Sequence, residues 1–168
     1  MKTVLVVLSL FFSVRFAQAQ EHKSPAPALL SLDAKGLDDL REKSKGRVLV
    51  LNLWATWCKP CVEEFPELLK LQREYGKKGL DVIFVSIDDD AKAKQKVTAF
   101  LKKMRVTRTA YIKEPGDDET FINSVNPNWS GAVPATLIYD SNGRFVEMGV
   151  EELDFFELEK IVTPLLPY

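Results

Sequence analysis

Apolar residues follow two different spacings along this chain, and each spacing predicts a different element. Two continuous runs rich in β-branched residues, at 48–54 and 80–87, are typical of strands covered on both faces of a sheet. Shorter runs predict further strands at 29–32, 110–113, 134–139 and 144–148. Between the last two, Asn142-Gly143 predicts a two-residue hairpin turn.

Helical spacing, with apolar residues at i, i+3 and i+4, separates these runs. For the helix that follows the second long run, we expect the acidic residues at 88–90 to supply the N-cap and the lysines at 92–96 to form a solvated face. Because strands alternate with helices, the fold class is α/β with a central sheet. The predicted helices run from Asp33 to near Gly46, from Val62 to Gly76, through Val97 and Met104, near Phe121, and over 153–165.

The first residues have the features of a secretory signal. Lys2 precedes an apolar run at 4–14, and Ala17-Gln18-Ala19 is a small-x-small cleavage site. The run is too short for a membrane-spanning helix, which needs ~20 apolar residues. We therefore expect a signal peptide at 1–19, a flexible tether at 20–28 and a folded domain at 29–168. This predicts an exported, periplasmic protein; the alternative is an uncleaved signal that anchors the chain to a membrane.

Composition and charge narrow the class of partner. The 168 residues and 46% hydrophobic content fit one soluble domain. The 23 basic and 24 acidic residues are spread along the chain and give a net charge of -1. Nucleic acid and anionic membranes are therefore not expected partners, and we expect a monomer.

The two cysteines, Cys58 and Cys61, have the spacing of a CxxC motif. A bridge between them closes too small a loop to stabilise a fold much, because that gain grows with loop length. A zinc site needs four ligands, and the only other soft ligand is His22 in the expected tether. The spacing therefore favours redox chemistry over an inert disulfide or half of a metal site.

The segment LNLWATWCKPCVEEFPEL and the later Val133-Pro134-Ala135 resemble thioredoxin-fold proteins, specifically the exported TlpA/ResA-like branch. The resemblance covers nearly all of 29–167. It implies a thioredoxin fold, with a four- or five-stranded mixed sheet flanked by helices and the CxxC pair at the start of a helix. It also implies that Pro134 is cis and lies opposite the cysteines, and that Pro66 kinks the active-site helix.

At a helix N-terminus, Cys58 is the candidate nucleophile. The attacking species is a thiolate, whereas a free cysteine has a pKa near ~8.5 and is mostly protonated at neutral pH. The unpaired N–H groups of the first turn and the cation of Lys59 favour the negative charge. Pro60 fits the first turn because its missing N–H is not needed there. Cys61, one turn further, is expected to be buried and to resolve the mixed disulfide.

The proton acceptor for Cys61 is the point where the chain departs from thioredoxin itself. Thioredoxins have a buried aspartate where this chain has Asn52, which cannot act as a base. In the TlpA/ResA-like branch a glutamate three residues after the second cysteine is implicated, and Glu64 has that position here. Partial shielding from water would raise its pKa into a useful range. The alternative is that Glu63 and Glu64 are solvated residues favoured by the helix dipole.

Side chains next to the pair are candidates for recognition. Trp57 is expected to be exposed as part of an apolar docking surface, whereas Trp54 is expected in the core. Trp129 is expected to border the same cleft, and backbone groups around Val133 could pair with an extended partner segment. The candidate substrate-binding residues are Trp57, Lys59, Pro60 and Val133.

Together these features predict a thiol–disulfide oxidoreductase with Cys58, Cys61, Glu64 and Pro134 as catalytic residues, no metal, and no cofactor besides the Cys58–Cys61 disulfide. The resemblance implies a reductase of protein disulfides, for example in cytochrome c maturation, with apocytochrome c as a possible partner and a membrane thiol carrier as electron donor. A disulfide-forming oxidase, a peroxiredoxin-like peroxidase and a copper or haem-delivery module stay open. Rapid reaction with peroxide would favour the peroxidase. Metal capture without disulfide reduction would favour the delivery module.

Overall fold

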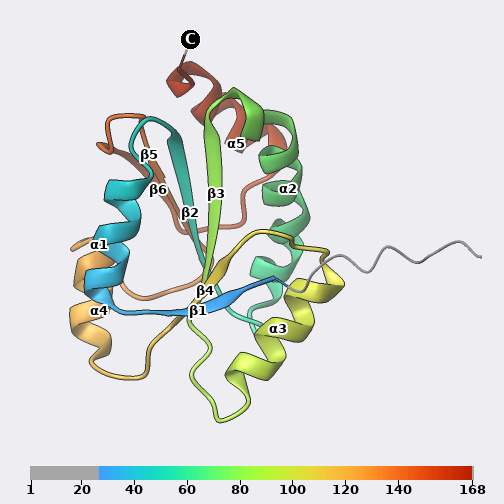
Figure 1. Cartoon of the computed structure of the whole chain (residues 1–168), viewed down its shortest axis with the longest axis vertical. Coiled ribbons are helices and arrows are strands. Elements are labelled where there is room, and N and C mark those ends of the chain that lie inside the picture. The colour runs from blue at the N-terminus through green and yellow to red at the C-terminus, as the bar shows by residue number, and fades with distance from the viewer. Residues whose placement is uncertain (1–26, 168) are drawn as a thin grey trace, which may run out of the picture.

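The computed structural model describes residues 27–167, which build a six-stranded mixed sheet between two layers of helices (Figure 1). The strands lie in the order β1-β4-β3-β2-β5-β6. The first four run parallel, whereas β5 is antiparallel to β2 and β6 is antiparallel to β5. The strands are β1 (Leu29–Leu32), β2 (Val48–Trp54), β3 (Leu80–Ser86), β4 (Ala110–Lys113), β5 (Ala135–Tyr139) and β6 (Phe145–Gly149).

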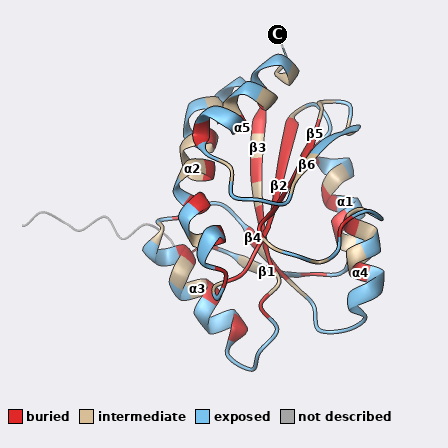
Figure 2. Ribbon diagram, turned by 180° about the vertical axis from the view of Figure 1, so that it is seen from behind, coloured by how far each residue is buried: buried red, intermediate tan, exposed pale blue. Residues whose placement is uncertain are grey.

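The helices cover both faces of this sheet. On one face α1 lies against α4, and on the other lie α2, α3 and α5 (Figure 1). Figure 2 shows buried residues along the strands and on the inward sides of the helices. The expected α/β sheet flanked by helices is confirmed, with six strands instead of four or five. The helices are α1 (Ala34–Lys43), α2 (Lys59–Tyr75), α3 (Ala93–Lys103), α4 (Asp118–Val125) and α5 (Phe155–Val162), with short 3-10 turns η1 (Gly76–Lys78) and η2 (Thr163–Leu165).

The central strand β2 contributes to both hydrophobic layers. All seven of its residues are buried, and successive side chains of a strand point to opposite faces. Val48, Val50 and Trp54 join the cluster beneath α2, α3 and α5. Leu49, Leu51 and Leu53 join the cluster beneath α1 and α4. By the same alternation Asn52 points toward α2, which places a polar side chain inside an apolar layer.

The turn between β5 and β6 differs from the expected two-residue turn. The N–H of Asp140 donates to the carbonyl of Arg144, and the N–H of Gly143 donates to the carbonyl of Asp140, both at 2.9 Å. Asp140 and Arg144 therefore close the hairpin, and the three residues at 141–143 form the loop between them. Gly143 has a φ of 79°, a left-handed conformation that suits glycine and closes this type of three-residue hairpin loop.

The start of α3 also differs from the sequence prediction. Lys92 has the N-cap position, and no side chain there accepts a hydrogen bond from the first turn. Asp90 accepts the N–H of Lys92 and pairs with Lys96, so it organises the loop before the helix. Asp88 is buried and directed elsewhere. The expected cap at 88–90 is therefore wrong, and the acidic run is not uniformly solvated.

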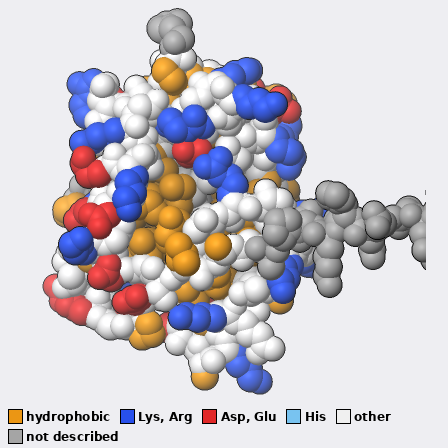
Figure 3. Space-filling model, viewed as in Figure 1, with side chains coloured by type: hydrophobic (Ala, Val, Ile, Leu, Met, Phe, Trp, Pro, Cys, Tyr) orange, Lys and Arg blue, Asp and Glu red, His pale blue; other side chains and the backbone are white. Residues whose placement is uncertain are grey.

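The amino end of the described chain is held by the sheet. Pro27 is buried, and the carbonyl of Ala28 accepts the N–H of Ala110 at 2.9 Å. The expected signal at 1–19 and most of the expected tether lie outside the described residues. Between residues 27 and 167, no helix is long and apolar enough to cross a membrane. Figure 3 shows acidic and basic side chains interspersed on one face, with a strip of apolar side chains between them.

Candidate active site

Cys58 and Cys61 form a disulfide bond at the carboxyl end of β2. Cys58 is the N-cap of α2, and its Sγ accepts the N–H of Cys61 at 3.2 Å. Pro60 lies in the first helical turn, as expected. Cys58 is 5% exposed and Cys61 2% exposed. When the bond is reduced, the same N–H and the helix dipole favour a thiolate at Cys58.

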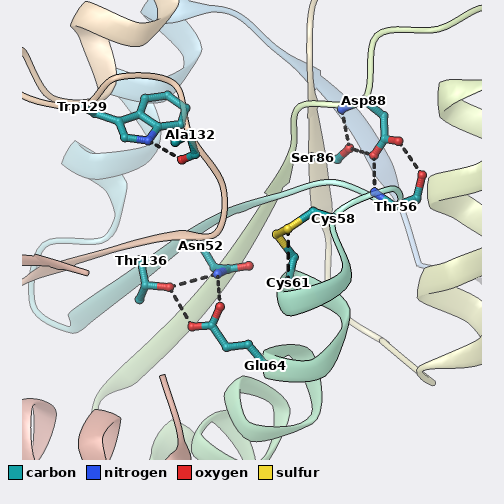
Figure 4. The surroundings of a disulfide bond; sticks show 10 residues. All are labelled: Asn52, Thr56, Cys58, Cys61, Glu64, Ser86, Asp88, Trp129, Ala132 and Thr136. Atoms are coloured by element: carbon teal, nitrogen blue, oxygen red, sulfur yellow. Dashed lines mark hydrogen bonds between the residues drawn. A yellow bond between two sulfur atoms is a disulfide. The ribbon is translucent and has the colours of Figure 1, made fainter. Parts of the chain in front are cut away.

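A buried polar trio lies behind the disulfide (Figure 4). Glu64, one turn after Cys61 on α2, is 0% exposed. The hydroxyl of Thr136 donates to Glu64 Oε1 at 3.1 Å. Asn52 Nδ2 donates to Thr136 Oγ1 at 3.0 Å and reaches Glu64 Oε2 at 3.5 Å. The carboxyl group is therefore held in one orientation by two strands of the sheet.

Burial raises the pKa of Glu64 from its ordinary 4.5 to about 7, and the nearby charge of Glu152 adds to the rise. Hydrogen bonds from Thr136, the backbone of Leu153 and Asn52 favour the ionised carboxylate, so they oppose this rise in pKa. A carboxyl group with this pKa exchanges its proton readily at neutral pH. Of the two glutamates considered from the sequence, Glu63 is the exposed one, and it pairs with Lys59 at 3.5 Å.

Asn52 and Glu64 could be recognised from the sequence, but Thr136 was not among the expected site residues. Asn52 and Thr136 are directly opposite each other in the β2–β5 ladder, so both side chains point to the same face of the sheet. The available signal was the isolation of Thr136, which is the one polar residue among the five buried positions of β5. An isolated polar residue in a buried strand requires a partner.

Asp88 is a second buried acid near the disulfide, and the expectation that it lies at a solvated helix start is wrong. It is 2% exposed. Its Oδ2 accepts the backbone N–H of Thr56 at 2.9 Å and the hydroxyl of Ser86 at 2.7 Å, and its Oδ1 accepts the hydroxyl of Thr56. Because Thr56 lies two residues before Cys58, these bonds fix the loop that presents the nucleophile (Figure 4).

The candidate recognition residues differ in exposure. Trp57 is 64% exposed, as expected, and Lys59 and Pro60 are exposed on the first turn of α2. Val133 is half-buried and Pro134 is buried, and the bond between them is cis, as the resemblance implied. Pro66 lies inside α2.

The two other tryptophans are in the interior. Trp54 is fully buried and contacts the rings of Phe65 and Phe100, which confirms its place in the core. Trp129 is also buried, and its Nε1 donates to the carbonyl of Ala132 at 2.8 Å in the loop before the cis bond. Over residues 27–167, no group of three or more His, Cys, Asp or Glu side chains is arranged to hold a metal ion. His22 lies outside that range.

A family model described as Redoxin matches residues 21–160. This chain belongs to the Redoxin family. The match includes the CxxC pair, the buried glutamate and the cis-proline loop, so the whole candidate site lies within the matched Redoxin domain.

Individual relatives of this Redoxin chain agree with that assignment. It is 32% identical over 120 residues to the thioredoxin-like protein YneN of Bacillus subtilis, covering 71% of this chain and 65% of YneN. It is 26% identical over 144 residues to the thiol-disulfide oxidoreductase ResA of Geobacillus kaustophilus, covering 86% of this chain and 78% of ResA. The thioredoxin domain of a thiol-disulfide oxidoreductase from Bacteroides vulgatus superposes with a TM-score of 0.62 at 23% identity, covering 86% and 97% of the two chains. This last likeness confirms the thioredoxin fold.

Proposed function

We propose that this protein reduces disulfides of exported proteins through the Cys58–Cys61 pair. Its class, a thiol–disulfide oxidoreductase, follows from the Redoxin match, from relatives such as ResA and from the CxxC disulfide. The observation that carries the mechanism is Glu64, buried one turn behind Cys61 with its carboxyl group fixed by Asn52 and Thr136.

The proposed cycle uses only groups of this chain. The Cys58 thiolate attacks one sulfur of a client disulfide, forming a mixed disulfide and releasing the other client sulfur as a thiolate. The Cys61 thiol transfers its proton to the Glu64 carboxylate and attacks Cys58 Sγ. This step releases the second client sulfur, so the client gains two electrons and the Cys58–Cys61 disulfide forms. No cofactor besides this disulfide is needed for the exchange.

The electrostatics around Cys58 support the reductase direction. A strong oxidant stabilises its reduced, thiolate form. Here Cys58 Sγ accepts one hydrogen bond from the described residues, that of the Cys61 N–H. Lys59 pairs with Glu63 on the helix surface, which weakens its effect on the sulfur. The ionised form of Glu64, one turn behind Cys61, disfavours a further negative charge nearby. These features limit the stabilisation of the Cys58 thiolate by the helix N-terminus, and they therefore support a reductant over a strong oxidant.

The cellular setting of this proposal comes from the sequence. The signal-like segment at 1–19 supports export to a periplasm. A reductase in an oxidising compartment must itself be re-reduced, so we propose a membrane thiol carrier as electron donor. Proteins that need free thiols, apocytochrome c among them, are the proposed clients. Fusing residues 1–19 to a reporter that is active only after export tests whether this segment directs export. Export of the fusion supports the proposal, and retention in the cytoplasm contradicts it.

The test of function is the redox equilibrium of the purified protein against dithiothreitol or glutathione, with Cys58→Ala as the control. A potential near ~-270 mV or lower supports the reductase. A potential near the ~-120 mV of a strong oxidant would make it a disulfide-forming enzyme. Absence of a reversible redox couple would contradict the reductase. Rapid consumption of peroxide would then favour the peroxidase, and capture of copper would favour the delivery module.

A further inference from the structure

A small pocket opens beside Trp57, at the face of the sheet covered by α1 and α4. Its apolar walls come from the active-site loop, the end of β3 and the α4 region, through Trp57, Ile87, Phe121, Ile122 and Trp129. The volume is about 170 Å³. Pockets for cofactors and drug-sized ligands usually measure ~300–1,000 Å³. This pocket therefore has room for one side chain and not for a whole small-molecule ligand.

The pocket is preformed by close packing of its walls. Gly131 lines it with a φ of 87°, and a Cβ at that position would lie 2.8 Å from Ile122 Cδ1. The loop that contains Gly131 is held by the hydrogen bond from Trp129 Nε1 to the carbonyl of Ala132. The loop and α4 are therefore in contact, and the pocket is already present in the protein without a bound client.

The mouth of the pocket has an excess of negative charge. Asp89 is exposed, and its carboxylate makes no ion pair with any residue from 27 to 167. Lys113, the one cation in the lining, is only 11% exposed in its side chain and is bound to Asp118. Asp117, the N-cap of α4, adds another negative charge next to this pair. A cation on an incoming segment therefore has Asp89 as a free partner.

We infer that this pocket selects client segments in which an apolar side chain beside the reacting cysteine is accompanied by a basic one. The inference rests on the proposed function, because the client cysteine is bonded to Cys58 and Trp57 is the adjacent residue. An extended chain advances ~3.3–3.6 Å per residue, so the residues flanking that cysteine reach the pocket next to Trp57. The apolar side chain fills the pocket, and the basic side chain pairs with Asp89 at its mouth.

The experiment uses reduced Cys61→Ser protein, in which Cys58 is the single nucleophile and the mixed disulfide accumulates. The probes are peptides whose cysteine is bonded to thionitrobenzoate. Cys58 attacks the peptide sulfur, and the departing thionitrobenzoate thiolate, a good leaving group, reports the rate by its absorbance. The three peptides are Lys-Leu-Cys-Leu-Lys, Lys-Ala-Cys-Ala-Lys and Glu-Leu-Cys-Leu-Glu.

We expect the leucine–lysine peptide to react about tenfold faster than the alanine–lysine peptide, because losing several buried carbons from a fitted pocket has at least that effect. The glutamate peptide is also expected to react more slowly than the leucine–lysine peptide. Asp89→Asn is expected to reduce the difference in reaction rate between the leucine–lysine peptide and the glutamate peptide. Asp90→Asn is the matched control: this neighbour pairs with Lys96, does not line the pocket and leaves that difference unchanged. Ile122→Phe, which fills the pocket, removes the leucine preference.

Equal rates for all three peptides would overturn the inference while leaving the redox activity intact, because thionitrobenzoate would still be released. The inference also fails if Asp90→Asn narrows the charge preference as much as Asp89→Asn does. Absence of release from every peptide would instead contradict the proposed function. If Ile122→Phe does not fold, the peptide series on the parent protein and the Asp89 and Asp90 variants decide the question.

Discussion

Asp88 accepts the backbone N–H of Thr56 at 2.9 Å and so joins the end of β3 to the loop before the nucleophilic cysteine. The N–H of Ile87 donates to the carbonyl of Trp54, which ties the same two segments. The N–H of Cys58 donates to the carbonyl of Ala55 and closes a turn around Thr56. The position of the Cys58 sulfur therefore depends on a buried carboxylate that does not itself contact the disulfide.

Asp88→Ala is expected to lower the free energy of unfolding by about 1–3 kcal/mol, because Thr56 and Ser86 lose a buried acceptor. It should also slow alkylation of reduced Cys58 at neutral pH several-fold, since the loop no longer holds the sulfur against the Cys61 N–H. Asp81→Ala is the control: it breaks the bridges to Arg47 and Arg108 at the other end of β3. It should lower stability without changing the alkylation rate. Equal slowing in both variants would contradict the prediction.

Glu64→Gln is expected to slow reduction of a protein disulfide such as insulin by about 10²-fold or more, because general-base assistance contributes about 10²–10⁴-fold. The pH dependence of the rate around pH 7 should flatten, since the group with a pKa of about 7 is gone. Glu63→Gln, one residue away and exposed, tests whether this effect is specific. A Glu64→Gln variant with the parent's pH profile would rule out this residue as the proton acceptor.

Thr136→Val removes a hydrogen bond that favours ionised Glu64. The pKa of Glu64 should therefore rise above its present value of about 7, and the inflection of the pH–rate profile should move to higher pH. Thr136→Ser keeps the hydroxyl and should restore the original inflection. An NMR titration of the Glu64 carboxyl group in the reduced protein measures the same shift directly. An unchanged or lowered pKa in the valine variant would contradict the assignment.

Glu64 also predicts how stability depends on pH. The folded protein keeps this proton up to a pKa of about 7, whereas the unfolded chain releases it near the ordinary 4.5. Between these values the folded state binds more protons, so this contribution is present at low pH and is lost as pH rises through 7. The total effect is about 3 kcal/mol. Urea unfolding from pH 4 to 8 should show the parent losing stability relative to Glu64→Gln; parallel curves would contradict this.

The sequence predicted most elements because buried strands and amphipathic helices leave local patterns. Glu64 could be proposed because the resemblance to the TlpA/ResA-like branch implicates a glutamate three residues after the second cysteine, here Cys61. The role of Thr136 could not be predicted, because it depends on the pairing of β2 with β5, which joins positions 84 residues apart. Asp88 was misjudged because three consecutive aspartates look alike in sequence. Only the geometry at the end of β3 turns the first of them inward.

The pairing of Asn52 with Thr136 has a consequence for folding as well as for chemistry. In strands, a shift of one residue turns every side chain to the opposite face. A slip of β5 against β2 would therefore bring an apolar side chain opposite Asn52 and leave the buried carboxyl of Glu64 without the Thr136 hydroxyl. The loss of this buried hydrogen bond disfavours the misaligned chain. The two residues that orient the proton acceptor Glu64 thus also specify the correct alignment of the two strands.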